Sequence, residues 1–168
     1  MTQTEQPEGT AHGSGVIAVD QFLPHPRDVV WRALVDPAQL AAWFMPNDFV
    51  PVVGHRFVLQ RKANCDLRFS DTIACCVLEV REPELLSYSW TDAAEYSSDL
   101  DSVVTWTLRL EGRGTRLLLE HRGFRPDDPV HQTAYDVMNG GWRIYIAERL
   151  AAYLDSQPAI RLTPQELP

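Results

Sequence analysis

The feature that most constrains the fold is the order of the hydrophobic patterns, because strand-like runs come first and one long amphipathic helical pattern comes last. Strands are predicted at residues 16–23, 54–61, 72–82, 85–91, 102–111 and 115–122. Residues 130–154 then carry apolar side chains along a broad helical stripe. Such a sheet cannot bury one face alone, so it must curl over the last helix. The sequence therefore predicts an α+β fold with a curved antiparallel sheet of six to seven strands around a long C-terminal helix.

Two short helices are predicted directly after the first strand. A Pro-His-Pro sequence ends the run at residues 16–23 and suits the first turn of a helix. Helical spacing of apolar residues extends over residues 26–35, where Asp36 and Pro37 break it, and a second short helix runs through residues 40–44.

The two predicted strands at residues 102–111 and 115–122 have the clearest core-facing sides. Alternation in the first strand predicts one core-facing row, which comprises Val104, Trp106, Leu108 and Leu110. In the second strand Leu117, Leu119 and His121 share one face. Polar stretches at residues 62–71 and 93–101 are interpreted as connections, the first as a loop or an irregular strand.

The chain is long enough for one domain, which we place at residues 15–155. Residues 1–14 and 156–168 are rich in Pro, Gly and polar side chains with little periodic apolar content, which predicts a disordered N-terminal tail and a flexible C-terminal tail.

Charge and composition argue against several classes of function. A net charge of -8 repels phosphate backbones and anionic lipids, so neither nucleic-acid binding nor membrane insertion is predicted, and a cytoplasmic location is expected. The three cysteines lack a two-cysteine zinc spacing, and no catalytic, phosphate-binding or metal motif is present. No cofactor, metal site or catalytic residue is therefore predicted, and a binding protein is favoured over an enzyme.

Two features of the predicted interior leave alternatives open. His121 is either a general base or polar anchor facing a cavity, or a core histidine hydrogen-bonded to a neighbour. Gly140 and Gly141 lie in the middle of the last helix, where each costs about 1 kcal/mol relative to alanine. They indicate a kink, a close approach to the backbone, or tight packing on the sheet.

Several motifs, in order along the chain, resemble the START-like helix-grip superfamily called SRPBCC. FLPHPRDVVWRALVDPAQLAAWF at residues 22–44 is similar to its opening strand and helices, and VLEVREPELLSYSW at residues 77–90 to its hairpin. SVVTWTLRLEGRGTRLLLEHRGF at residues 102–124 resembles its last hairpin, and GGW at residues 140–142 its closing helix. The specific resemblance is to homologues of the activator of the 90-kDa heat-shock protein ATPase. In WFMP, Met45 replaces the usual glycine before Pro46, which could alter the cavity mouth.

The resemblance implies a cavity between sheet and helix that holds a small hydrophobic ligand without catalysis. The candidate ligand-binding residues are Trp43, Phe44, Trp90, Trp106, His121, Tyr135, Met138, Gly141 and Trp142. Arg143 and Arg149 could reach a ligand carboxylate, with projection of both side chains to solvent as the alternative.

Two further functions stay open on the basis of the resemblance. One is a secondary-metabolism protein, either a polyketide cyclase or a self-sacrificing enediyne resistance protein attacked at Gly140 or Gly141. The other is a co-chaperone-like protein with a chaperone partner, and the chain is expected to be a monomer or a homodimer.

Overall fold

The structure is a computed structural model that describes residues 15–61, 71–92 and 100–158. The predicted N-terminal tail, most of the two polar connections and the last ten residues lie outside this part of the chain. Within it, the C-terminal helix continues to Ser156, so it extends just past the predicted end of the domain.

Six antiparallel strands form a single sheet in the order β1-β6-β5-β4-β3-β2. The strands are β1 (Val16–Leu23), β2 (Arg56–Gln60), β3 (Thr72–Arg81), β4 (Leu85–Asp92), β5 (Ser102–Glu111) and β6 (Gly114–Arg122). Strands β2 to β6 follow one another as neighbours, while β1 pairs with β6 along its whole length. The predicted number of strands and their antiparallel pairing are confirmed.

Helices α1 (Arg27–Val35) and α2 (Pro37–Trp43) follow β1 as predicted. Asp36 ends α1, and its carboxylate accepts a hydrogen bond from the backbone N–H of Gln39 at 2.9 Å, which caps α2. The Trp43 indole N–H donates to the carbonyl of Ala33 at 2.8 Å. This buried bond fixes the angle between the two helices and directs the chain after Trp43 into the interior.

The last helix is continuous from residue 129 to residue 156, and its middle is widened. It consists of α3 (Pro129–Arg143), a π-helical segment η1 (Ile144–Leu150) and α4 (Ala151–Ser156). Its buried apolar residues recur every four positions, as Ala134, Met138, Trp142, Ile146, Leu150 and Leu154. In an ideal α-helix each such step turns the side chain by about 40°, so five steps would carry the row to the opposite face. The wider π turn offsets this drift and keeps the row on the sheet.

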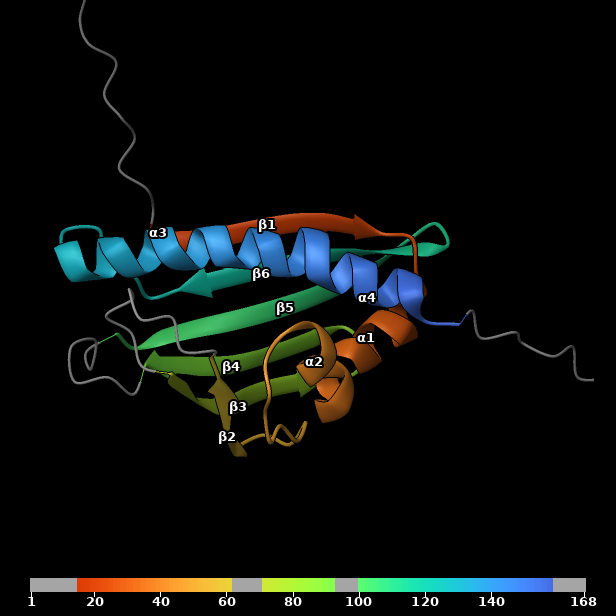
Figure 1. Cartoon of the computed structure of the whole chain (residues 1–168), viewed down its shortest axis with the longest axis horizontal. Helices are drawn as coiled ribbons and strands as arrows, with labels where there is room; N and C mark the ends of the chain where they lie inside the picture. The colour runs from red at the N-terminus through yellow and green to blue at the C-terminus, as the bar shows by residue number, and fades with distance from the viewer. Residues whose placement is uncertain (1–14, 62–70, 93–99, 159–168) are drawn as a thin grey trace, which may run out of the picture.

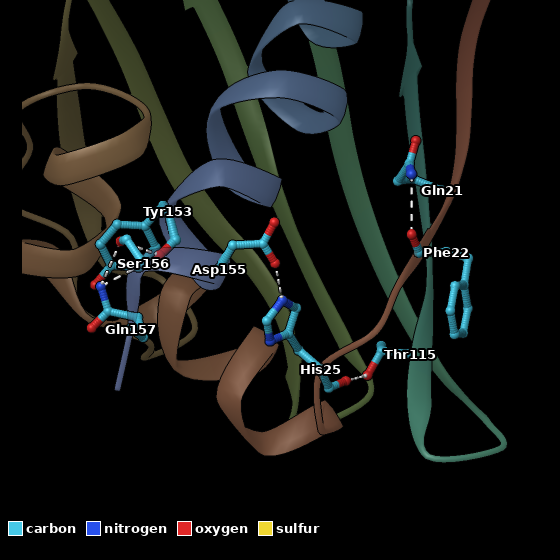
Figure 2. A network of polar contacts seen from close by, with 8 residues as sticks. All are labelled: Gln21, Phe22, His25, Thr115, Tyr153, Asp155, Ser156 and Gln157. Atoms are coloured by element: carbon cyan, nitrogen blue, oxygen red, sulfur yellow. Dashed lines mark hydrogen bonds and ion pairs between the residues drawn. The ribbon is translucent and has the colours of Figure 1, made fainter. Parts of the chain in front are cut away.

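The helix runs along the sheet, and near its C-terminal end α1 contacts α4 while α2 contacts η1 (Figure 1). That end is tied to the β1–α1 junction, where the His25 ring nitrogen Nε2 lies 2.8 Å from an Asp155 carboxylate oxygen. Figure 2 shows this pair together with Thr115 of β6, whose hydroxyl donates to the His25 carbonyl at 2.8 Å. The helix therefore closes over the sheet, which confirms the helix-grip fold.

Two details of the core differ from the sequence analysis. Leu110 was expected on the buried row of β5 but is 66% exposed, because it stands beside the turn that joins β5 to β6 at the rim of the sheet. The sequence analysis assigns no buried position to His131, yet this side chain is only 2% exposed. Its Nδ1 accepts a hydrogen bond from the backbone N–H of Arg125 at 3.0 Å, so its burial closes the connection from β6 into α3.

Candidate functional site

A pocket of about 180 Å³ lies between the C-terminal helix, the end of α2 and strand β4. We call it the tryptophan pocket, and its walls are Phe44, Met45, Arg61, Trp90, Val137, Met138, Gly141, Trp142 and Tyr145. Most of these side chains are apolar or aromatic, as is usual for a site that holds a small molecule. For comparison, an apolar cavity of about 150 Å³ in another protein is large enough to bind benzene.

Five of the nine predicted ligand-binding residues form walls of this pocket: Phe44, Trp90, Met138, Gly141 and Trp142. The other four do not line it. Trp43 and Trp106 are buried behind the wall, and Tyr135 packs edge-on against Phe124 with ring centroids 5.5 Å apart. His121 is the fourth, and it is completely buried.

Trp142 is the wall residue at the centre of a cluster of aromatic contacts. Its ring stacks on Phe44 at a centroid distance of 5.3 Å and meets Trp106 edge-on at 5.5 Å. Phe44 in turn meets Tyr145 edge-on at 4.7 Å. Offset stacked and edge-to-face contacts are the favourable geometries for aromatic pairs, so the cluster is well packed around one side of the pocket.

A chain of hydrogen bonds holds Trp142 from behind. Its indole N–H donates to His121 Nδ1 at 3.0 Å. Because an indole can only donate, Nδ1 must carry no proton, and the neutral ring then has its proton on Nε2. Nε2 lies 2.9 Å from the Ser102 hydroxyl oxygen, which donates to the Trp90 carbonyl at 2.8 Å. Every polar atom of the imidazole is satisfied in this one tautomer.

This arrangement disfavours a general base at position 121. Burial lowers the pKa of His121 from 6.5 to about 3, so the ring stays neutral at ordinary pH. Its one acceptor nitrogen is engaged by Trp142, and the ring does not border the pocket. The geometry fits the alternative of a core histidine, which here joins two tryptophans of the wall, Trp90 through Ser102 and Trp142 directly.

Gly140 and Gly141 of the last helix are not tightly packed on the sheet. The interpretation of tight packing is therefore wrong. A Cβ atom built on either Gly140 or Gly141 would meet nothing within 4 Å outside the helix itself. Gly140 is exposed, whereas Gly141 is half-buried and borders the pocket. The missing side chain at Gly141 therefore leaves part of the pocket's space open.

Four wall residues were missed by the sequence analysis: Met45, Arg61, Val137 and Tyr145. Met45 had a signal, since it departs from the glycine usual in related motifs, and here it does border the pocket. Tyr145 belongs to the apolar stripe of the last helix. Arg61 follows the last residue of β2, and no sequence pattern distinguishes it.

One buried donor at the wall lacks an acceptor. The Trp90 indole N–H is buried and has no hydrogen-bond partner among residues 15–61, 71–92 and 100–158. Leaving such a group unsatisfied costs about 1–3 kcal/mol.

In the described part of the chain, no three His, Cys, Asp or Glu side chains lie together as metal ligands. No helix there is long and apolar enough to cross a membrane.

Residues 24–155 match the family described as Activator of Hsp90 ATPase homolog 1-like protein. The chain belongs to this family. The family lies within the SRPBCC helix-grip superfamily, in agreement with the sheet and helix described above. A comparison with curated proteins gives no match.

Many solved structures match this chain, and three of them illustrate the shared fold. Protein MLL2253 from Mesorhizobium loti is 36% identical with a TM-score of 0.74, over 85% of this chain and 98% of that one. CalU16 from Micromonospora echinospora is 26% identical with a TM-score of 0.65, over 84% and 76%. DynU16, from the dynemicin biosynthetic locus, is 24% identical with a TM-score of 0.69 over 86% of this chain, which spans about half (48%) of that protein.

Proposed function

We propose that this family member binds a small hydrophobic molecule in the tryptophan pocket without catalysing a reaction. The single observation that carries the proposal is a pocket of about 180 Å³ between the sheet and the last helix, with walls that are mostly apolar and aromatic. Small-molecule sites are usually concave and lined by such side chains. A hydrophobic ligand that covers these walls removes apolar surface from water, which favours binding.

The candidate residues have distinct roles in this proposal. Phe44, Trp90, Met138 and Trp142 contact the ligand, and Gly141 leaves the space that it occupies. His121 contributes indirectly, because it orients Trp142.

A matched pair of variants tests the proposal with benzene as the probe. Gly141→Leu should fill the pocket and abolish binding, whereas Gly140→Leu places the same side chain on the exposed neighbour and should leave binding intact. Binding is measured from the shifts of the tryptophan indole N–H signals in NMR spectra during titration. Native mass spectrometry of protein from cell extract then identifies the natural ligand.

Two outcomes of the titration would refute the proposal. One is that benzene leaves the indole signals of the wild-type protein unchanged. The other is that Gly141→Leu responds as strongly as the wild type.

A second candidate is a self-sacrificing resistance protein that captures a reactive enediyne at Gly141. It is favoured by a glycine whose backbone borders the pocket and by likeness to DynU16, which comes from the dynemicin biosynthetic locus. In a host exposed to an enediyne, Gly141→Ala should lose protection while remaining folded, and Gly140→Ala should keep it. Full protection by Gly141→Ala would remove this candidate.

A further inference from the structure

A second hollow adjoins the tryptophan pocket, and it has a different character. It measures about 760 Å³ and lies between α2, β2 and the π segment η1. Phe44, Met45, Arg61 and Tyr145 border both hollows, so the two meet along a shared wall. We call the larger one the arginine groove, after Arg61 and Arg149 on its border.

Among the described residues, the lining of the arginine groove carries positive but no negative charge. Arg61 and Arg149 border it, and none of the described residues along it is Asp or Glu. This is unusual for a chain with a net charge of -8, whose acidic residues outnumber the basic ones by 23 to 15. The other polar groups there are the amide of Gln60 and the hydroxyls of Tyr145 and Tyr153, all of which can donate hydrogen bonds.

Arg149 is positioned but not neutralised. Its guanidinium carbon lies 4.7 Å over the centre of the Tyr145 ring, a cation–π contact that holds the guanidinium beside this wall residue. In the described part of the chain, no carboxylate forms an ion pair with it. The guanidinium therefore keeps its hydrogen-bond donors for a group that enters the groove.

We propose that the ligand is an apolar carboxylic acid, bound with its apolar body in the tryptophan pocket and its carboxylate in the arginine groove. The proposal rests on the function proposed above and adds the chemical class of the ligand. Guanidinium groups match the planar carboxylate with two parallel N–H donors, and such charge-assisted bonds are about twice as strong as neutral ones. Arg61 and Tyr145 border both hollows, so the two lie side by side, and in this proposal one molecule extends from the first into the second.

The structure also corrects the earlier assignment of arginines. Arg143 was a candidate for the carboxylate together with Arg149, but it borders neither hollow. Arg61, which follows β2, borders both hollows and takes that place. Arg143 and Arg149 are both exposed on the same helix, but only Arg149 borders the groove, so Arg143 provides a matched control.

The test compares two probes of nearly equal shape, 3-phenylpropionate and 3-phenylpropanamide, by calorimetry and by the tryptophan indole signals. The acid should bind the wild-type protein about tenfold more tightly than the amide, since hydrogen bonds to charged groups supply roughly that difference. Arg149→Gln and Arg61→Gln should each weaken binding of the acid more than binding of the amide, so that the preference for the acid falls. Arg143→Gln should change neither.

The outcomes separate this inference from the proposed function. Equal binding of acid and amide, or equal loss of acid binding in Arg143→Gln, would overturn the carboxylate inference while the tryptophan pocket remains a binding site. Absence of binding by both probes, together with a normal benzene response, would also overturn it, because the acid would then not fit. Failure of benzene itself would refute the proposed function first.

Discussion

The two sides of Trp142 differ in how they are filled, although the same ring forms both. On one side lie Trp106, His121 and Ser102, which are fully buried and joined by contacts or hydrogen bonds. On the other side is the tryptophan pocket, where Gly141 contributes no side chain. The first side we call the sealed side and the second the open side.

The difference shows how the Trp142 ring can stay in place beside an open pocket. An aromatic ring at the edge of such a pocket tends to move into it, because contact with other atoms is favourable. Here the indole N–H of Trp142 is bonded to His121, and Trp106 packs against its edge, so movement toward the open side would break both interactions. The contacts on the sealed side therefore keep the Trp142 ring from moving into the tryptophan pocket on the open side.

The largest expected effect comes from removing the centre of the sealed side. His121→Ala would leave the Trp142 indole and the Ser102 hydroxyl with one partner fewer and would create a cavity. Both effects destabilise, and together they should lower the free energy of unfolding by about 4 kcal/mol. Urea denaturation monitored by tryptophan fluorescence measures this.

His25→Ala is the matched control for that change. It removes the contact between His25 Nε2 and the Asp155 carboxylate, which is largely exposed, and should cost less than about 1 kcal/mol. Similar losses in the two variants would show that His121 does not brace the sealed side.

A pH series sharpens the same comparison. The unfolded chain binds a proton at His121 near pH 6.5, whereas burial keeps the folded ring neutral until about pH 3. Over that interval the unfolded state holds more protons, so stability falls as the pH decreases from about 6.5 toward 3 and levels off below it. From pH 7 to pH 5 the loss assigned to this residue is about 2 kcal/mol.

The comparison variant for the pH series is His121→Gln, which keeps one donor and one acceptor but does not titrate. The difference between wild type and variant isolates His121 from all other titrating groups. A difference that stays constant between pH 7 and pH 5 would contradict a buried neutral imidazole.

Most of the fold could be predicted because burial repeats at short intervals along the chain. Val104, Trp106 and Leu108 alternate along β5, and all three are buried. The long helix followed from its apolar stripe, but the π segment did not, although strict four-residue spacing from Ala134 to Leu154 is its signature. A regular α-helix was assumed, and its period drifts from that spacing.

The pocket could be predicted only in part, for a different physical reason. Its walls come from distant elements, with Phe44 after α2, Trp90 on β4 and Trp142 on the helix. Sequence patterns show that such residues are inside, but whether space remains between them depends on packing across the fold. This explains why Trp106 and Trp142 looked alike in sequence, yet only Trp142 borders the pocket.

The smallest expected effect tests whether the open side is truly open. Gly141→Ala should raise the free energy of unfolding by about 1 kcal/mol, since alanine favours the helix and its Cβ would meet nothing within 4 Å outside the helix. Gly140→Ala, on the exposed face, should gain a similar amount for the same reason. Thermal unfolding of both variants provides the measurement. A loss of stability in Gly141→Ala beside a gain in Gly140→Ala would mean that atoms already fill the space at Gly141, and the contrast between the two sides of Trp142 would then fail.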